Sequence, residues 1–202
     1  MKVILIGATG IIGQAVSQAL TGQHEVIPVS RSKGEYPVDL TDKASVQTLF
    51  ERVAPFDAII CAAGAAKFAP LANLSDDDFQ FSLANKLMGQ VNVVRVGMDF
   101  IGDRGSFTLT SGVLAQQPMP GSAAISLVNA GLEGFVRAAA LELPRGIRVN
   151  VVSPPWVSET LTAMGQDPSG GMPATQVAQA YVASLDSDCT GEVIAAQAFA
   201  VK

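Results

Sequence analysis

The sequence contains little of the side-chain chemistry on which many enzymes rely. It has a single histidine, His24, in the turn after the first predicted helix, which leaves almost no material for a histidine-based triad or a histidine-containing metal site. Its two cysteines, Cys61 and Cys189, are far apart and lack the spacing of a metal site. Both stand in apolar surroundings, and we expect two buried free thiols. No metal ligand set is predicted.

Long apolar runs and basic clusters are also missing. No run of about 20 apolar residues exists, so no membrane span is expected. Only four strongly apolar residues separate Lys2 from Gly7, which is too few for a secretion signal. The formal net charge of -5 argues against binding of nucleic acid. Together with the unpaired thiols, these features indicate a cytoplasmic protein.

The composition is that of a well-packed globular protein. Hydrophobic residues make up 49% of the 202 residues and charged residues 15%, which allows a large core in one domain, residues 1–202. Apolar runs predict strands over residues 3–6, 24–30, 36–40, 55–64, 106–112, 147–153 and 191–198. Helical patterns separate most of them, over residues 14–20, 43–53, 75–100, 122–143 and 173–185. This alternation predicts an α/β fold, a Rossmann-like doubly wound parallel sheet.

A glycine-rich turn follows the first predicted strand and leads into a helix. Its glycines are Gly7, Gly10 and Gly13. A strand, a glycine turn and a helix N-terminus together form a ready anion site, which a dinucleotide uses for its diphosphate. Gly7 allows the sharp turn, Gly10 the close approach of a phosphate, and Gly13 the close packing of the helix on the strand. A purely structural turn is the alternative, because glycine turns are common between strands and helices.

The end of the second predicted strand distinguishes between the two nicotinamide cofactors. An acid usually stands there to hold the adenosine ribose of NAD, but this strand ends in Ser30, Arg31 and Ser32. A guanidinium and two hydroxyls suit the 2′-phosphate of NADP. We therefore expect NADP(H), with NAD(H) the less favoured choice. A solvated loop arginine beside Glu35 is the alternative interpretation.

Several motifs, taken in order along the chain, resemble those of the short-chain dehydrogenase/reductase family. They are the three glycines of the turn, the small strand end 61–64, the helix segment 85–89 beginning with Asn85, the strand-end residue Ser111, the helix segment 130–135, and residues 154–157 after the sixth strand. The resemblance covers nearly the whole chain. It implies a dinucleotide-binding fold that transfers hydride between a nicotinamide cofactor and a small carbonyl or alcohol.

The resemblance and the turn chemistry together define a set of expected site residues. The expected cofactor contacts are Gly7, Thr9, Gly10, Ile11, Ile12, Gly13, Ser30, Arg31, Ser32, Asp39, Leu40, Ala62, Ala63, Gly64, Asn129, Pro154 and Val157. The expected remnants of the family's catalytic group are Ser111, which could orient a carbonyl, and Asn85, which could hold a water molecule.

The family's Tyr-x-x-x-Lys motif is missing from this chain. Aligning residues 130–135 with the family places Ile125 at the tyrosine position and Asn129 at the lysine position. Tyr36 and Tyr181 are the only tyrosines, and neither lies near this helix in the sequence. Loss of a positioned general acid typically costs ~10²–10⁴ in rate. The standard hydride-transfer site is therefore predicted to be incomplete.

Two functions of different classes remain open. The first is an NADP(H)-binding protein that has lost the standard reaction. The second is an active NADPH-dependent oxidoreductase on a small carbonyl substrate with another proton donor. Lys86, or water held by Asn85, Ser122 or Ser126, could supply that proton, although helix packing or capping is the simpler role for the two serines.

The family resemblance also implies assembly. The helices predicted over residues 75–100 and 122–143 carry more apolar side chains than one face of a sheet needs. Family members pack the corresponding helices against those of a second copy. We expect a homodimer or homotetramer with closed symmetry.

Overall fold

A computed structural model describes residues 1–200, so residues 201 and 202 of the predicted domain lie outside the described part. The strands are β1 Lys2–Ile6, β2 Glu25–Ser30, β3 Tyr36–Pro37, β4 Phe56–Cys61, β5 Ile101–Thr110, β6 Arg148–Ser153 and β7 Val193–Ala195. The α-helices are α1 Ile11–Leu20, α2 Lys43–Val53, α3 Asp76–Ser82, α4 Gly89–Gly97, α5 Ala123–Ala139, α6 Ser158–Ala163 and α7 Ala174–Asp186. A wide π-helical turn, η2 Leu83–Met88, joins α3 to α4.

The seven strands form one parallel sheet in the order β3-β2-β1-β4-β5-β6-β7. The α/β class and the doubly wound parallel sheet predicted from the sequence are thereby confirmed. The strand order reverses between β1 and β4, and in sheets of this kind ligands bind at the carboxyl ends of the strands beside such a switch point.

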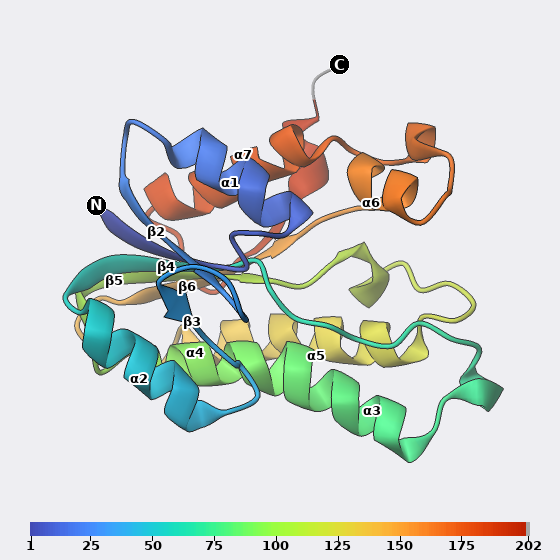
Figure 1. The fold of residues 1–202 in the computed structure, drawn as a ribbon, viewed down its shortest axis with the longest axis horizontal. Helices are drawn as coiled ribbons and strands as arrows, with labels where there is room; N and C mark the ends of the chain where they lie inside the picture. The colour runs from blue at the N-terminus through green and yellow to red at the C-terminus, as the bar shows by residue number, and fades with distance from the viewer. Residues whose placement is uncertain (201–202) are drawn as a thin grey trace.

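Helices cover both faces of the sheet (Figure 1). Helices α1 and α7 lie on one face, above the sheet in this view, and α2, α4 and α5 lie on the other. One cluster of buried residues packs under each layer, and the strands between them are buried on both faces. This explains why the strands are continuous apolar runs rather than alternating ones. No helix among residues 1–200 is long and apolar enough to cross a membrane.

Element boundaries differ from the sequence prediction mainly where a turn ends a segment early. Helix α5 stops at Ala139 rather than at residue 143. Pro144 disfavours helical backbone at the residue before it, and Arg145 and Gly146 follow with positive φ angles. The last strand is only three residues long, because the chain turns into a 3₁₀ helix, Ala196–Phe199. The long helix predicted over residues 75–100 is interrupted by the π turn.

One cysteine lies in a different environment from the predicted one. Cys61 is fully buried at the end of β4, as expected, and burial raises the pKa of its thiol to about 11. Cys189 is exposed, so the prediction of two buried thiols was wrong for this residue. It lies in the loop between α7 and β7, since the last strand starts only at Val193.

A buried chain of hydrogen bonds ties α7 to the end of β5. The Thr110 hydroxyl donates to the backbone carbonyl of Cys61 at 2.7 Å and lies 2.7 Å from the Tyr181 hydroxyl. Because the threonine proton is directed to the carbonyl, Tyr181 donates to Thr110. The Tyr181 side chain is fully buried, and burial raises the pKa of its hydroxyl.

Replacing Tyr181 by Phe should destabilise the fold, because the buried Thr110 oxygen then loses the donor that Tyr181 supplies. We expect a loss of about 1–2 kcal/mol in the free energy of unfolding, measured by urea denaturation. Tyr36→Phe is the matched control, since Tyr36 is the other tyrosine of the chain and is only half-buried. Equal effects of the two substitutions would contradict this account.

Candidate functional site

The glycine turn between β1 and α1 is held tightly against the end of β4. Gly7 has a φ of +89°, and a Cβ atom placed there would lie 2.8 Å from the carbonyl oxygen of Ala62. A Cβ atom at Gly13 would collide with the carbonyl of Gly7. At Gly10 the nearest atom would be 3.4 Å away. Gly10 caps α1 without a side-chain hydrogen bond, so the first amides of the helix remain available to an anion.

A first pocket opens beside this turn, at the carboxyl ends of β1 and β2. Its walls come from the turn, from the segments after β2 and β3, from the end of β4, and from η2. It is lined by Ile6, Gly7, Thr9, Gly10, Ser30, Arg31, Val38, Asp39, Leu40, Ala62, Ala63, Gly64, Ala65 and Asn85.

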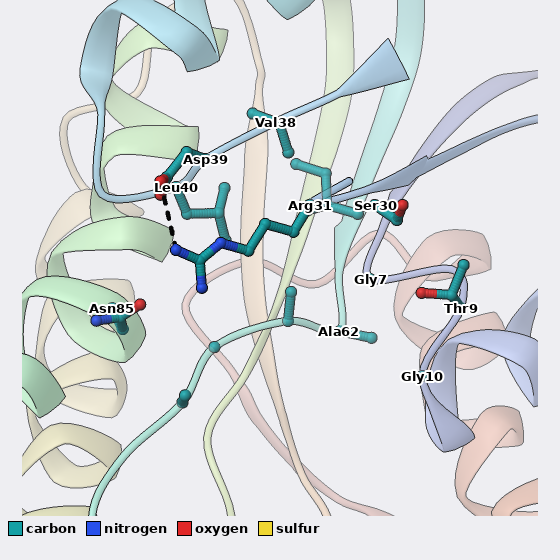
Figure 2. Close-up of a pocket in the computed structure, with 14 residues that line it drawn as sticks. Gly7, Thr9, Gly10, Ser30, Arg31, Val38, Asp39, Leu40, Ala62 and Asn85 are labelled. Atoms are coloured by element: carbon teal, nitrogen blue, oxygen red, sulfur yellow. Dashed lines mark ion pairs between the residues drawn. The ribbon is translucent and has the colours of Figure 1, made fainter. Parts of the chain in front are cut away.

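Arg31 is the cation of this first pocket. Figure 2 shows its side chain reaching across the pocket toward Asp39, with a separation of 3.7 Å between guanidinium nitrogen and carboxylate oxygen. Hydrogen bonds from the hydroxyl and the amide of Thr41 hold the pKa of Asp39 below its usual range. The Ser30 hydroxyl is used locally, because it bonds the backbone of Lys33. Arg31 therefore supplies the charge that a 2′-phosphate would need.

A second pocket adjoins the first at the end of β4, and Ala62, Ala63 and Gly64 line both. Its other walls come from η2, the end of β5, α5 and the segment after β6. It is lined by Ile12, Ala62, Ala63, Gly64, Lys86, Thr110, Ser111, Gly112, Val113, Leu114, Ile125, Asn129, Pro154, Pro155, Trp156, Val157 and Thr160. Of the predicted site residues, Ile11, Gly13 and Ser32 line neither pocket.

The π turn decides which residue of η2 enters the second pocket. Asn85, predicted to lie with Ser111 in the active site, instead lines the first pocket, and its amide donates to the carbonyl of Phe81 at 3.0 Å. Its neighbour Lys86 lines the second pocket. A π turn holds an extra residue and so turns the following side chains to a different face. Asn85 and Ser111 thus line two adjoining pockets, and Lys86 lines the one that contains Ser111.

Lys86 is buried, and it has no charged partner among residues 1–200. Its side chain is 9% exposed, and no Asp or Glu side chain from residues 1–200 lines this pocket. Burial lowers the pKa of Lys86 to about 8, and the effect of Cys61 in the opposite direction is smaller. The amine is therefore a stronger acid than an ordinary lysine. The sequence signal was a lysine inside an apolar helical stretch, which was noted as one candidate donor among several.

Helix α5 presents the two substituted family positions to the same pocket. Ile125 and Asn129, four residues apart, both line it. The Asn129 side chain is 1% exposed, and its amide donates to the carbonyl of Gly112 at 3.5 Å. Its oxygen has no hydrogen-bond partner among the described residues. A buried acceptor of this kind fits a ligand hydroxyl, because an unpaired polar atom is costly to bury.

Ser111 lines the second pocket, and its hydroxyl is engaged by a buried acid. It donates to the Glu133 carboxylate at 3.2 Å, and that carboxylate also accepts from Gln116 and pairs with Arg137. Glu133, only 4% exposed, was missed from the sequence, although an acid on the apolar face of the helix was a visible signal. A Cβ atom at the next residue, Gly112, would lie 3.0 Å from the Asn129 amide nitrogen. Because Gly112 has no side chain, the backbone at this strand end can lie close to the Asn129 amide.

The two serines considered as alternative donors serve the helix. The Ser122 hydroxyl accepts from the amide of Met119 and donates to its carbonyl, and the Ser126 hydroxyl bonds that of Ser122. Neither residue lines the second pocket. Ser122 stands at the N-cap of α5 but makes no side-chain cap hydrogen bond, so the two hydroxyls hold the turn before the helix instead.

Comparison with known proteins identifies the family. A family model described as enoyl-(acyl carrier protein) reductase matches residues 10–199. The chain belongs to the short-chain dehydrogenase/reductase family. Protein lin1944 from Listeria innocua, a solved structure, is similar at 38% identity and a TM-score of 0.93, over 96% of this chain and 98% of that one.

Two further proteins of related sequence carry informative descriptions. A small-chain dehydrogenase solved in complex with NADPH is 27% identical, with a TM-score of 0.85, over 96% of this chain and 95% of that one. Hydroxynaphthalene reductase arp2 of Aspergillus fumigatus is 26% identical over 74% of this chain, and the match spans 56% of its own length. The chain is therefore a dehydrogenase/reductase-like oxidoreductase in family and fold.

Proposed function

We propose that this protein is an NADP(H)-dependent oxidoreductase that works without the tyrosine–lysine pair of its family. Ile125 can neither donate nor accept a proton, and Asn129 carries no charge, so the standard site is incomplete. The sequence left two functions open, a cofactor-binding protein and an active oxidoreductase. The first would not require a buried ionisable group in the second pocket. The observation that favours an active oxidoreductase is that Lys86 lies there.

The two adjoining pockets fit a dinucleotide phosphate. The open position at Gly10 and the free amides of α1 would hold the diphosphate, and Arg31 the 2′-phosphate. Asp39 and Leu40 line the adenosine end, and the unpaired oxygen of Asn129 would accept from a ribose hydroxyl in the second pocket. Pro154 and Val157 also line the second pocket. When bound, the cofactor supplies or accepts the hydride.

The pocket walls, the net charge and the free thiols support proposals about the substrate, the partners and the location of the protein. The second pocket has mostly apolar walls and one cation, which suits a small carbonyl compound or alcohol. The net charge of -5 gives no basis for a nucleic-acid partner. We place the protein in the cytoplasm, where thiols such as Cys61 and Cys189 stay reduced.

Assembly into a homodimer or homotetramer is part of the proposal. Three large apolar side chains on α3, η2 and α5 are exposed to solvent in the single chain: Phe81 at 39%, Met88 at 40% and Leu127 at 50%. A second copy would bury them through closed symmetry. Val91 and Val94, on the same long helical segment, are buried in the core and cannot serve this purpose.

The first prediction concerns cofactor choice. Arg31→Ala should weaken NADPH binding by about 10- to 100-fold, because a bidentate charged contact to the 2′-phosphate is lost, while NADH binding changes little. Titration by NADPH fluorescence or calorimetry measures both. Lys33→Ala is the control, since Lys33 is a neighbouring cation that does not line the pocket. Equal affinity of the wild type for the two cofactors, or binding of neither, would refute this assignment.

A second prediction concerns the missing pair. We expect slow carbonyl reduction by the wild type, and a gain of about tenfold or more when Ile125→Tyr and Asn129→Lys are combined, because the acid and its supporting charge return together. Either change alone should do little. The control combines Ile125→Phe with Asn129→Lys, which keeps the ring and removes the hydroxyl. Equal rates for the two double variants would show that no proton passes through this position.

Light scattering at micromolar concentration tests the assembly. The wild type should have two or four times the chain mass of 20.9 kDa. Leu127→Glu should shift the population toward monomer, since a charge would be buried in the interface. Met164→Glu is the control, because Met164 is also exposed but follows α6, which lies with α1 and α7 on the opposite face of the sheet. A monomeric wild type would overturn this part of the proposal.

A further inference from the structure

We propose that Lys86 is the catalytic acid of this site, donating the proton that the family's tyrosine would otherwise supply. The inference rests on the proposed function and assigns one step of it to one atom, the side-chain nitrogen of Lys86. The sequence left four candidate sources for this proton. The structure removes Asn85, Ser122 and Ser126 from the second pocket and leaves Lys86 in it.

The backbone brings Lys86 to the pocket by a close approach of two elements. A Cβ atom at Gly64 would lie 3.2 Å from the Cα atom of Lys86, so a side chain there would crowd η2 against the segment after β4. Gly64 has a φ of +135°, which also favours glycine. On the other side, Gln90 on α4 holds both the amide and the carbonyl of Thr110, at 2.8 and 2.9 Å. These contacts fix η2 against the floor of the pocket.

The charged and titratable groups around Lys86 leave its amine free to act. Cys61, at the end of β4, is the titratable group that couples to it, and its thiol stays protonated because burial raises the pKa to about 11. From α5, the pocket receives Ile125 and Asn129, which carry no charge. The acid that α5 buries, Glu133, is engaged by Ser111, Gln116 and Arg137. Burial in this surrounding lowers the pKa of Lys86 to about 8.

A balanced step can be written for carbonyl reduction. The carbonyl carbon would receive a hydride from bound NADPH, which would thereby be oxidised to NADP⁺. The electron pair of the C=O π bond moves to the oxygen, which takes a proton from the Lys86 ammonium. Lys86 is left as a neutral amine and regains a proton from water. A pKa near 8 suits both halves of this cycle, because an acid works best when its pKa is close to the working pH.

The competing role for Lys86 is that of a fixed positive charge that binds a ribose or an anionic substrate. Two variants separate these roles. Lys86→Arg keeps the charge but cannot release a proton, since arginine stays protonated in proteins. Lys86→Met removes both charge and proton while filling a similar volume with apolar atoms. Lys67→Met is the control, because Lys67 is half-exposed and pairs with Asp78 outside the pocket.

Activity is measured as NADPH oxidation on a panel of aliphatic and aromatic aldehydes and ketones. If Lys86 is the acid, kcat falls by ~10²–10⁴ in both Lys86→Arg and Lys86→Met, while Lys67→Met is unaffected. The kcat of the wild type should be constant below a pH of about 8 and fall about tenfold per pH unit above it. Ethylamine added to Lys86→Ala should restore part of the rate. Retained activity in Lys86→Arg with loss in Lys86→Met would overturn the proposal in favour of charge binding.

A measurement without cofactor or substrate tests the titration itself. The pKa of Lys86 is about 8 in the folded chain against an ordinary value of 10.5, so between these two pH values the unfolded chain binds more protons. The stability of the wild type relative to Lys86→Met should therefore rise as the pH increases from about 8 to 10.5, as followed by urea denaturation. A flat difference over this range would mean that Lys86 titrates as an ordinary exposed lysine, and would overturn the proposal.

The remaining outcomes are distinguished by NADPH fluorescence on the same proteins. If the wild type does not bind NADPH, the proposed function fails. If it binds NADPH but reduces no member of the panel, the protein binds the cofactor without this reaction, and the catalytic role of Lys86 is rejected. Binding with slow reduction that is lost in both Lys86 variants supports the assignment.

Discussion

The close approach of backbone segments at the end of β4 is the constraint on which the site depends. The turn after β1 touches the backbone of Ala62 at Gly7, and η2 reaches the same strand end at Gly64. Side chains larger than hydrogen at these two glycines would separate the elements. The small residues between them line both pockets, so one ligand can run from the adenosine end to the substrate end across a single strand terminus. The glycines that allow these backbone segments to pack closely also leave the space that the two pockets occupy.

The sequence was sufficient to predict the fold class and the elements that border the first pocket. Parallel strands buried on both faces are continuous apolar runs, and these runs alternate with helices whose starts are marked, as at Asp42 and Ser75, by capping side chains. The glycine turn follows β1 and Arg31 follows β2. Because these two strands are parallel neighbours, both features lie beside the same pocket. Boundaries such as the early end of α5 were less predictable, because turn geometry after Ala139 competes with a good helical pattern.

The lining of the second pocket was harder to predict from the sequence, for a physical reason. Which residue of a helix faces a cleft depends on helical phase, and a π turn changes that phase without a sequence signature that we recognised. Asn85 therefore lines the first pocket, and Lys86 lines the second. Ser111 lies at the strand end, as predicted. Its hydroxyl, however, donates to Glu133, which is 22 positions away in the sequence, and local sequence patterns do not connect the two residues.

The wide turn at Leu83–Met88 also has a consequence for how such a site can change over evolutionary time. Adjacent residues of a regular helix differ in direction by about 100°. Deleting one residue from this segment would restore regular pitch and rotate one flank relative to the other by about that angle. A different side chain would then face the cleft while every remaining residue kept its identity. A change of chain length, rather than a substitution, is thus a route by which this scaffold can exchange an amine for an amide.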